Sequence, residues 1–99
     1  TNVKLMQNVP NPLSGTTDIR YQNQISSADG GRPTAVTLKV YGLSGRVVKA
    51  LVDREQGAGY YSVRWDRKDD AERMVAPGVY FYRLTTGSFR ATRKMVVLR

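Results

Sequence analysis

Short stretches in which apolar and polar residues alternate constrain the fold of this chain more than any other feature of its sequence. In residues 36–41 a valine, a leucine and a second valine occupy every other position, and Tyr61, Val63 and Trp65 do the same in residues 60–65. A period of two is typical of strands that bury one face. No stretch of useful length has the period of a helix, so the chain is predicted to be all-β.

Turn-forming residues separate these stretches at the short intervals that immunoglobulin-like Greek-key sandwiches produce. We therefore expect a single β-sandwich domain over residues 1–99, with about seven antiparallel strands. The expected strands lie within residues 1–7, 16–25, 36–41, 46–52 and 60–65, followed by a hairpin over residues 78–99.

The segments between these strands also carry predictions. Pro10 and Pro12 predict a rigid crossing after the first strand, and the irregular pattern of residues 46–52 predicts a bulge near Lys49 and Ala50. Residues 53–59 and 66–77 are predicted to be polar connections. Residues 26–33 form a long connection rich in glycine and serine, which we expect to be mobile.

The predicted hairpin at the end of the chain begins at residue 77, and its two strands flank a turn at Thr86-Gly87-Ser88. Domain ends usually fray, but these closing residues have the pattern of an apolar strand that pairs up to the last residue. Because an unpaired buried guanidinium is costly, Arg83 belongs on the exposed face. This register places Tyr80, Tyr82 and Leu84 in the core and Val79, Phe81 and Arg83 outside.

The chain contains neither histidine nor cysteine, which excludes disulfides, cysteine-based metal sites, thiol nucleophiles and imidazole bases. No serine lies in a glycine elbow. Asp66, Asp69, Asp70 and Glu72 form an acidic cluster on one connection, where a glycosidase pair would lack a cleft. The pattern favours a solvated turn neutralised by nearby cations, with calcium ligation as the alternative. We expect no enzymatic activity and no cofactor.

Sixteen lysines and arginines against eight acidic residues give a net charge of +8 and a pI near 10.2. This balance permits binding to nucleic acid, acidic glycans or lipopolysaccharide, and is equally consistent with a well-solvated surface on a module of a larger protein. No apolar run approaches the roughly 20 residues that span a bilayer. The first residues lack the apolar core of a signal peptide, so we expect a piece of a longer protein.

The aromatic residues raise two further binding functions, nucleic-acid binding and sugar binding. Rings and cations interleave, as in single-strand nucleic-acid binders, at Tyr60, Arg64, Phe81, Arg83, Phe89 and Arg90. Aromatic residues at period two are more often core or cross-strand pairs, and no recognition motif accompanies them, so we expect no nucleic-acid binding. A sugar-binding platform of Trp65 and a tyrosine requires Trp65 to be exposed.

Charge is unevenly distributed along the chain. No acidic residue follows Glu72, whereas six cations do: Arg73, Arg83, Arg90, Arg93, Lys94 and Arg99. Charges on an edge strand prevent pairing with other chains. They also suit docking of an acidic partner or addition of a strand. Both interpretations stay open.

Six segments carry a family pattern. Residues 5–12 are Leu-Met-Gln-Asn-Val-Pro-Asn-Pro, and residues 16–21 are Thr-Thr-Asp-Ile-Arg-Tyr. Together with residues 36–48, 59–66, 77–84 and 93–98, they resemble, in order and spacing, the C-terminal sorting domains of the type IX (Por) secretion system. The immunoglobulin-like domain of the flagellar hook-capping protein shares the strands. The Pro-Asn-Pro opening and the Lys-Met-Val-Val-Leu ending favour the sorting domain.

The chain departs from the family pattern at three places. Leu13-Ser14 stands where Phe-Asn is common, Arg67 replaces a frequent glycine, and Glu72-Arg73 occupies a usual glycine turn. All three lie in predicted loops, so the expected fold is unchanged.

The resemblance implies a non-catalytic signal domain that directs a larger exported protein of a Bacteroidetes-type bacterium to the cell surface or the medium. The implied partners are the outer-membrane secretion translocon and a sortase-like peptidase, with the domain a monomer or weakly self-associating. The alternatives are an accessory module that binds glycan or lipopolysaccharide, and a flagellar-cap-like assembly domain. The residues expected to be recognised are Gly78, Tyr80, Tyr82, Arg93, Lys94, Met95, Val96, Val97 and Leu98.

Overall fold

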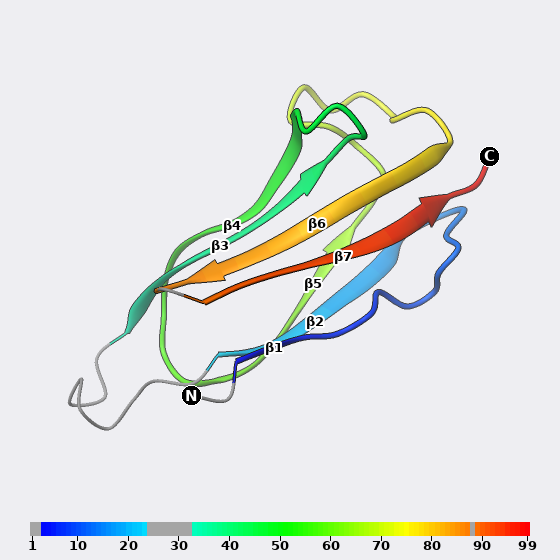
Figure 1. Cartoon of the computed structure of the whole chain (residues 1–99). Coiled ribbons are helices and arrows are strands. Elements are labelled where there is room, and N and C mark those ends of the chain that lie inside the picture. The colour runs from blue at the N-terminus through cyan, green and yellow to red at the C-terminus, as the bar shows by residue number, and fades with distance from the viewer. Residues whose placement is uncertain (1–2, 24–32, 88) are drawn as a thin grey trace.

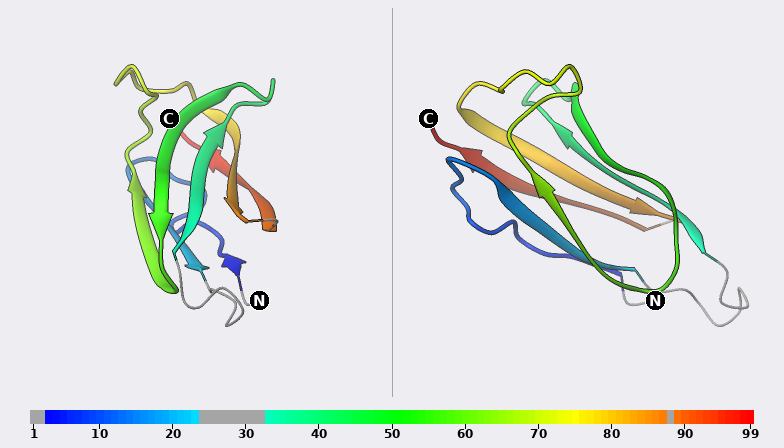
Figure 2. Two further views of the ribbon diagram at one scale, coloured as in Figure 1. Left: turned by 90° about the vertical axis from the view of Figure 1, so that its left-hand side faces the viewer. Right: turned by 180° about the vertical axis from the view of Figure 1, so that it is seen from behind.

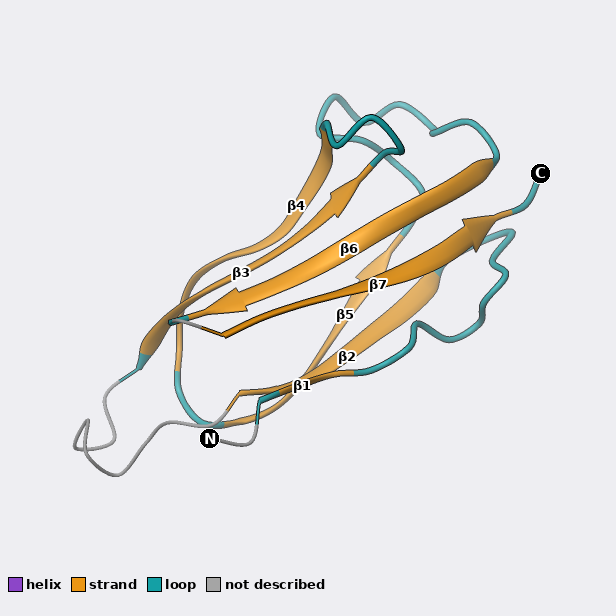
Figure 3. Cartoon of the chain, in the orientation of Figure 1, coloured by secondary structure: helices purple, strands orange, loops and turns teal. Residues whose placement is uncertain are grey.

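The computed structural model describes residues 3–23, 33–87 and 89–99 of the chain. These residues form seven strands and no helix, as Figure 3 shows. In chain order the strands are β1 (Lys4–Leu5), β2 (Thr17–Asn23), β3 (Thr34–Tyr41), β4 (Val47–Gln56), β5 (Gly59–Trp65), β6 (Gly78–Thr86) and β7 (Phe89–Val97).

The strands form two antiparallel sheets that pack face to face (Figure 1, Figure 2). One sheet has the order β1-β2-β5 and the other has the order β4-β3-β6-β7. The chain changes sheet after β2, after β4 and after β5, which is the crossing pattern of a Greek-key sandwich. The all-β sandwich expected from the sequence is confirmed.

The core lies between the sheets and follows the period-two pattern. Ile19 and Tyr21 of β2 and Val36, Leu38 and Val40 of β3 are fully buried. Trp65 at the end of β5 is also fully buried, and its indole N–H donates to the carbonyl of Lys68 at 2.9 Å. Trp65 is therefore a core residue, and the sugar platform that needed it exposed is excluded.

The predicted register of β6 is confirmed. Tyr82 and Leu84 are fully buried, and Tyr80 is half-buried with its ring edge-on to Trp65 at a centroid distance of 6.0 Å. Arg83 lies on the outer face of its sheet, where its guanidinium stacks over the ring of Tyr41 at 5.2 Å.

Two predicted boundaries were wrong. Residues 53–56 continue β4 instead of forming a connection, because they pair with residues 34–37 of β3. β7 begins at Phe89, directly after the predicted turn, but it ends at Val97 and so stops short of the last residue.

The bulge prediction is confirmed. Register shifts follow Leu38 and Val40 of β3, and they fall on either side of the stretch of β4 that contains Lys49 and Ala50. Most of the loop predicted to be mobile, residues 26–32, lies outside the described residues.

The acidic cluster supports turns in the loop that precedes β6. The Asp69 carboxylate accepts hydrogen bonds from the backbone N–H groups of Ala71 and Arg73, both at 2.9 Å. Lys49 lies 3.3 Å from the Glu72 carboxylate and 4.0 Å from that of Asp70. In the part of the chain that the structure describes, no three or more metal-binding side chains come together. The geometry supports the interpretation as a solvated turn.

Two of the three departures from the family pattern fall where the backbone favours glycine. Arg67 has a φ of +63° and Glu72 a φ of +64°, the left-handed region in which a side chain costs about 1–2 kcal/mol. The loop therefore keeps the turns of a glycine-containing loop with larger residues in place.

We predict that Glu72→Gly raises the free energy of unfolding by about 0.5 kcal/mol, because relief of the left-handed strain exceeds both the entropy that glycine adds to the unfolded chain and the loss of the exposed ion pair with Lys49. Arg73→Gly is the matched control and should lower it by about 0.5–1 kcal/mol. Urea denaturation measures both. Equal losses in the two variants would contradict the strain argument.

Candidate functional site

Residues 6–13, which we call the strap, lie along the outer edge of β7 (Figure 1). The Gln7 amide donates to the carbonyl of Lys94 at 2.8 Å, and the Val96 N–H donates to the Asn11 side chain at 2.9 Å. Leu13 completes the contact: its N–H donates to the carbonyl of Val96 at 2.9 Å, and its carbonyl accepts the Leu98 N–H at 2.7 Å. The strap thus satisfies backbone groups on the edge of β7 from Lys94 onwards.

Tyr82 of β6 joins the strap to the core through its side-chain hydroxyl. Its buried hydroxyl donates to the carbonyl of Met6 at 2.7 Å and accepts the N–H of Asn8 at 2.8 Å. Burial raises the pKa of this hydroxyl to about 12, against the opposing effects of the Asn8 N–H and the charge of Arg93. One phenol therefore fixes two backbone groups of the strap.

Asn8 and Thr17 hold the strap in its bent course. The Asn8 side chain is buried, and its NH₂ group donates to the carbonyl of Pro10 at 3.1 Å and to the Thr17 hydroxyl at 3.0 Å. The Thr17 hydroxyl in turn donates to the carbonyl of Pro10 at 2.9 Å. The Gln-Asn-x-Pro sequence is thus explained by bonds that its own side chains make.

Leu13 was missed as a functional residue by the sequence reasoning, which placed it in a loop. The structure buries it completely and pairs it with Val97 in a parallel bridge. The available signal was its position, because it is the only large apolar residue between the two prolines and the start of β2. Leu13 anchors the far end of the strap in the core.

The nine residues expected to be recognised fall into three groups by exposure. Tyr82, Met95 and Val97 are buried and cannot touch a partner while the domain is folded. Gly78, Tyr80 and Val96 are half-buried, and Arg93, Lys94 and Leu98 are exposed. The structure brings all nine together at β6, at β7 and directly after β7, but only the last three have exposed side chains.

Gly78 and Tyr80 shape the start of β6. Gly78 has a φ of +150°, and a Cβ at this position would meet no atom within 4 Å, so its backbone angle is what favours glycine. The Tyr80 hydroxyl donates to the carbonyl of Ala76 at 2.6 Å, and burial raises its pKa. Both residues fix the turn into β6.

The accessible part of the hairpin is positively charged. Arg90, Arg93 and Lys94 are exposed, and no acidic residue lies in β6 or β7. The Arg93 Nε–H donates to the carbonyl of Leu5 at 2.7 Å, which links β7 to β1. Because the strap already bonds the edge from Lys94 onwards, strand addition is blocked there, and side-chain contacts with an acidic partner are favoured.

The residues weighed for nucleic-acid binding do not form one surface. Tyr60 and Arg64 lie on the outer face of the sheet that contains β5, whereas Phe81 and Arg83 lie on the outer face of the other sheet. Stacking on successive rings along one strand of nucleic acid is therefore ruled out for this set.

We predict that Tyr82→Phe lowers the free energy of unfolding by about 1–3 kcal/mol at pH 7, because two buried backbone groups lose their partner. In the wild type, the contribution of Tyr82 is complete below the unfolded pKa of 10 and is lost as the pH rises towards 12. Stability should therefore fall less steeply above pH 10 in the variant. Urea titrations at pH 7 and above pH 10 measure this.

Tyr60→Phe is the matched control, since the Tyr60 side chain is exposed. It should change stability by less than about 0.5 kcal/mol. A Tyr82→Phe variant as stable as the wild type would show that the hydroxyl does not hold the strap.

The fold also occurs in a small part of a larger solved structure. Latent dimeric PorU from Porphyromonas gingivalis matches with a TM-score of 0.75 and 18% identity, over 97% of this chain and 9% of that one. AlkC, a DNA glycosylase from Pseudomonas fluorescens, matches at a TM-score of 0.49 and 16% identity, over 98% of this chain and 30% of that one. No curated protein sequence matches the chain.

A family model settles the relationship that the motifs indicated. The model of the secretion system C-terminal sorting domain matches residues 9–98. Such domains are generally non-catalytic. Separately, the described residues include no helix that is long and apolar enough to cross a membrane. The chain therefore belongs to the C-terminal sorting domains of the type IX secretion system, which direct proteins to the cell surface or the medium.

Proposed function

We propose that the outer-membrane translocon recognises the folded terminal hairpin together with the strap, and that residues 1–99 act as one non-catalytic unit. The contact is made by the exposed side chains of Arg93, Lys94 and Leu98. A sortase-like peptidase then removes the domain from its cargo. The domain works as a monomer or with weak self-association.

The observation that carries this proposal is the set of hydrogen bonds between the strap and β7. These bonds reach from the carbonyl of Lys94 to the N–H of Leu98. A strand held in this way presents its side chains in a fixed order on a rigid edge. Fixed side chains lose less entropy on binding than those of a flexible tail, which favours recognition of the folded state.

The nine residues differ in burial, which decides whether each can contact a partner or only support the fold. Tyr82, Met95 and Val97 lie at 0–1% exposure, so they support the surface through the fold and not by contact. Arg93 and Lys94 supply positive charge within β7, and Leu98, directly after β7, supplies an exposed apolar side chain. The fitting partner surface is acidic with an apolar recess, because both features are complemented at once.

The test is export of a reporter fused to residues 1–99 in a host with an active type IX system. We predict that the double variant Arg93→Glu and Lys94→Glu lowers secretion at least about tenfold, equivalent to about 1.4 kcal/mol of recognition. The matched control reverses two exposed charges away from β7. These are Arg46, in the turn before β4, and Arg54, in β4.

Folding is checked by thermal denaturation of each purified domain, because Arg93 also bonds to Leu5. Lys94→Glu alone separates recognition from stability, because the Lys94 side chain makes no ion pair with any described residue. Unchanged secretion of the folded double variant would refute recognition through these side chains, as would an equal loss in the control.

A further inference from the structure

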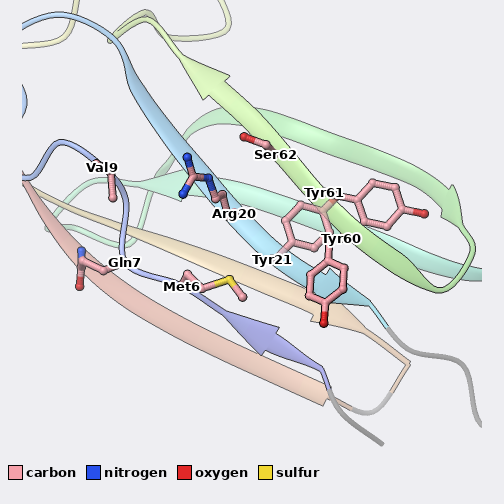
Figure 4. A pocket seen from close by; sticks show the side chains of 8 residues that line it. All are labelled: Met6, Gln7, Val9, Arg20, Tyr21, Tyr60, Tyr61 and Ser62. Carbon is pink, nitrogen blue, oxygen red and sulfur yellow. The ribbon is translucent and has the colours of Figure 1, made fainter.

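A cavity of about 420 Å³ opens on the outer face of the three-stranded sheet, beside the strap (Figure 4). Met6, Gln7 and Val9 of the strap border it on one side, and Arg20, Tyr60 and Ser62 on the other. The volume falls within the range of small-ligand sites, which combine apolar walls with a few polar groups. The three side chains proposed to contact the translocon, Arg93, Lys94 and Leu98, do not line this cavity.

Tyr60 gives the cavity an accessible aromatic wall. Its side chain is 78% exposed, whereas Tyr61 on the opposite face of the same strand stacks on Tyr21 at a centroid distance of 5.3 Å. An exposed tyrosine ring on a strand gains nothing from the core, and its face suits the apolar C–H face of a sugar ring.

Polar groups lie next to this ring. Arg20 and Ser62 are directly paired across β2 and β5, one row from Tyr60 along the strand. The diagonal separation between Arg20 and Tyr60 is therefore about 7 Å. A ring stacked on Tyr60 thus has a guanidinium and a hydroxyl within reach of its substituents.

The cavity is cationic. Asp18 is the acidic residue on this face of β2, and its carboxylate is taken by the Arg64 guanidinium at 3.1 Å. Arg20 forms no ion pair with any described residue, and Lys4, which is exposed on β1, adds a second cation to the same face. The ligand that complements this face carries negative charge.

We propose that this cavity binds an acidic sugar residue of a glycan. The pyranose ring stacks on Tyr60, its carboxylate or phosphate pairs with Arg20, and its hydroxyls bond to Ser62. The side chains that contact the sugar differ from Arg93, Lys94 and Leu98, which contact the translocon in the proposed function, so glycan binding and export can succeed or fail separately.

The 99-residue chain is titrated at low salt with three probes. Binding is measured by calorimetry and by the NMR shifts of backbone amides. Tetragalacturonate has rings and charge, maltotetraose has rings alone, and tetraglutamate has charge alone. We expect saturable binding of tetragalacturonate at millimolar affinity or tighter, and at least about tenfold weaker binding of the other two. Shifted amides should cluster on β1, β2 and β5.

Variants assign the contacts. Tyr60→Ala and Arg20→Gln should each weaken tetragalacturonate binding at least about fivefold. Arg90→Gln is the matched control, because it removes the same charge from the exposed face of the other sheet. The proposal is overturned if tetragalacturonate does not saturate, if tetraglutamate binds as tightly, or if Arg90→Gln weakens binding as much as Arg20→Gln.

Discussion

The buried hydroxyl of Tyr82 is the interaction on which the terminal part of the structure depends. It bonds to backbone groups of Met6 and Asn8, which lie 76 and 74 residues away along the chain. Through this contact the two ends of the sequence become one structural unit. The strap then bonds to β7 and gives the final strand a partner on its outer side. An edge that would otherwise fray or pair with other chains is thereby closed.

Periodicity predicted the fold because one face of each central strand is buried. It predicted the inward residues of β3, the alternation of β5 and the register of β6. It failed for residues 53–56, because Asp53, Arg54 and Glu55 are all exposed at the sheet edge and show no alternation. It also missed Leu13, whose partner Val97 lies at the other end of the chain. Edge strands and distant pairings leave little local pattern to read.

The candidate site was predicted in part. Family motifs indicated the terminal strand and the Pro-Asn-Pro opening separately, but not that Gln7 and Asn11 bond to β7. Those bonds depend on the three-dimensional path of the strap. The sequence also did not separate exposed residues such as Lys94 from buried ones such as Met95, which the structure assigns to contact and to support respectively.

The central claim is that the export signal is a folded surface built from both ends of the domain and not a linear tail. The most direct measurement is secretion of a reporter that carries Leu13→Asp. This variant places a charge in the core, 80 residues before Arg93, and leaves the exposed side chains of Arg93, Lys94 and Leu98 unaltered. Secretion should fall to background, whereas Leu43→Asp, at an exposed position between β3 and β4, should leave secretion close to wild type. Wild-type secretion of an unfolded Leu13→Asp domain would contradict it.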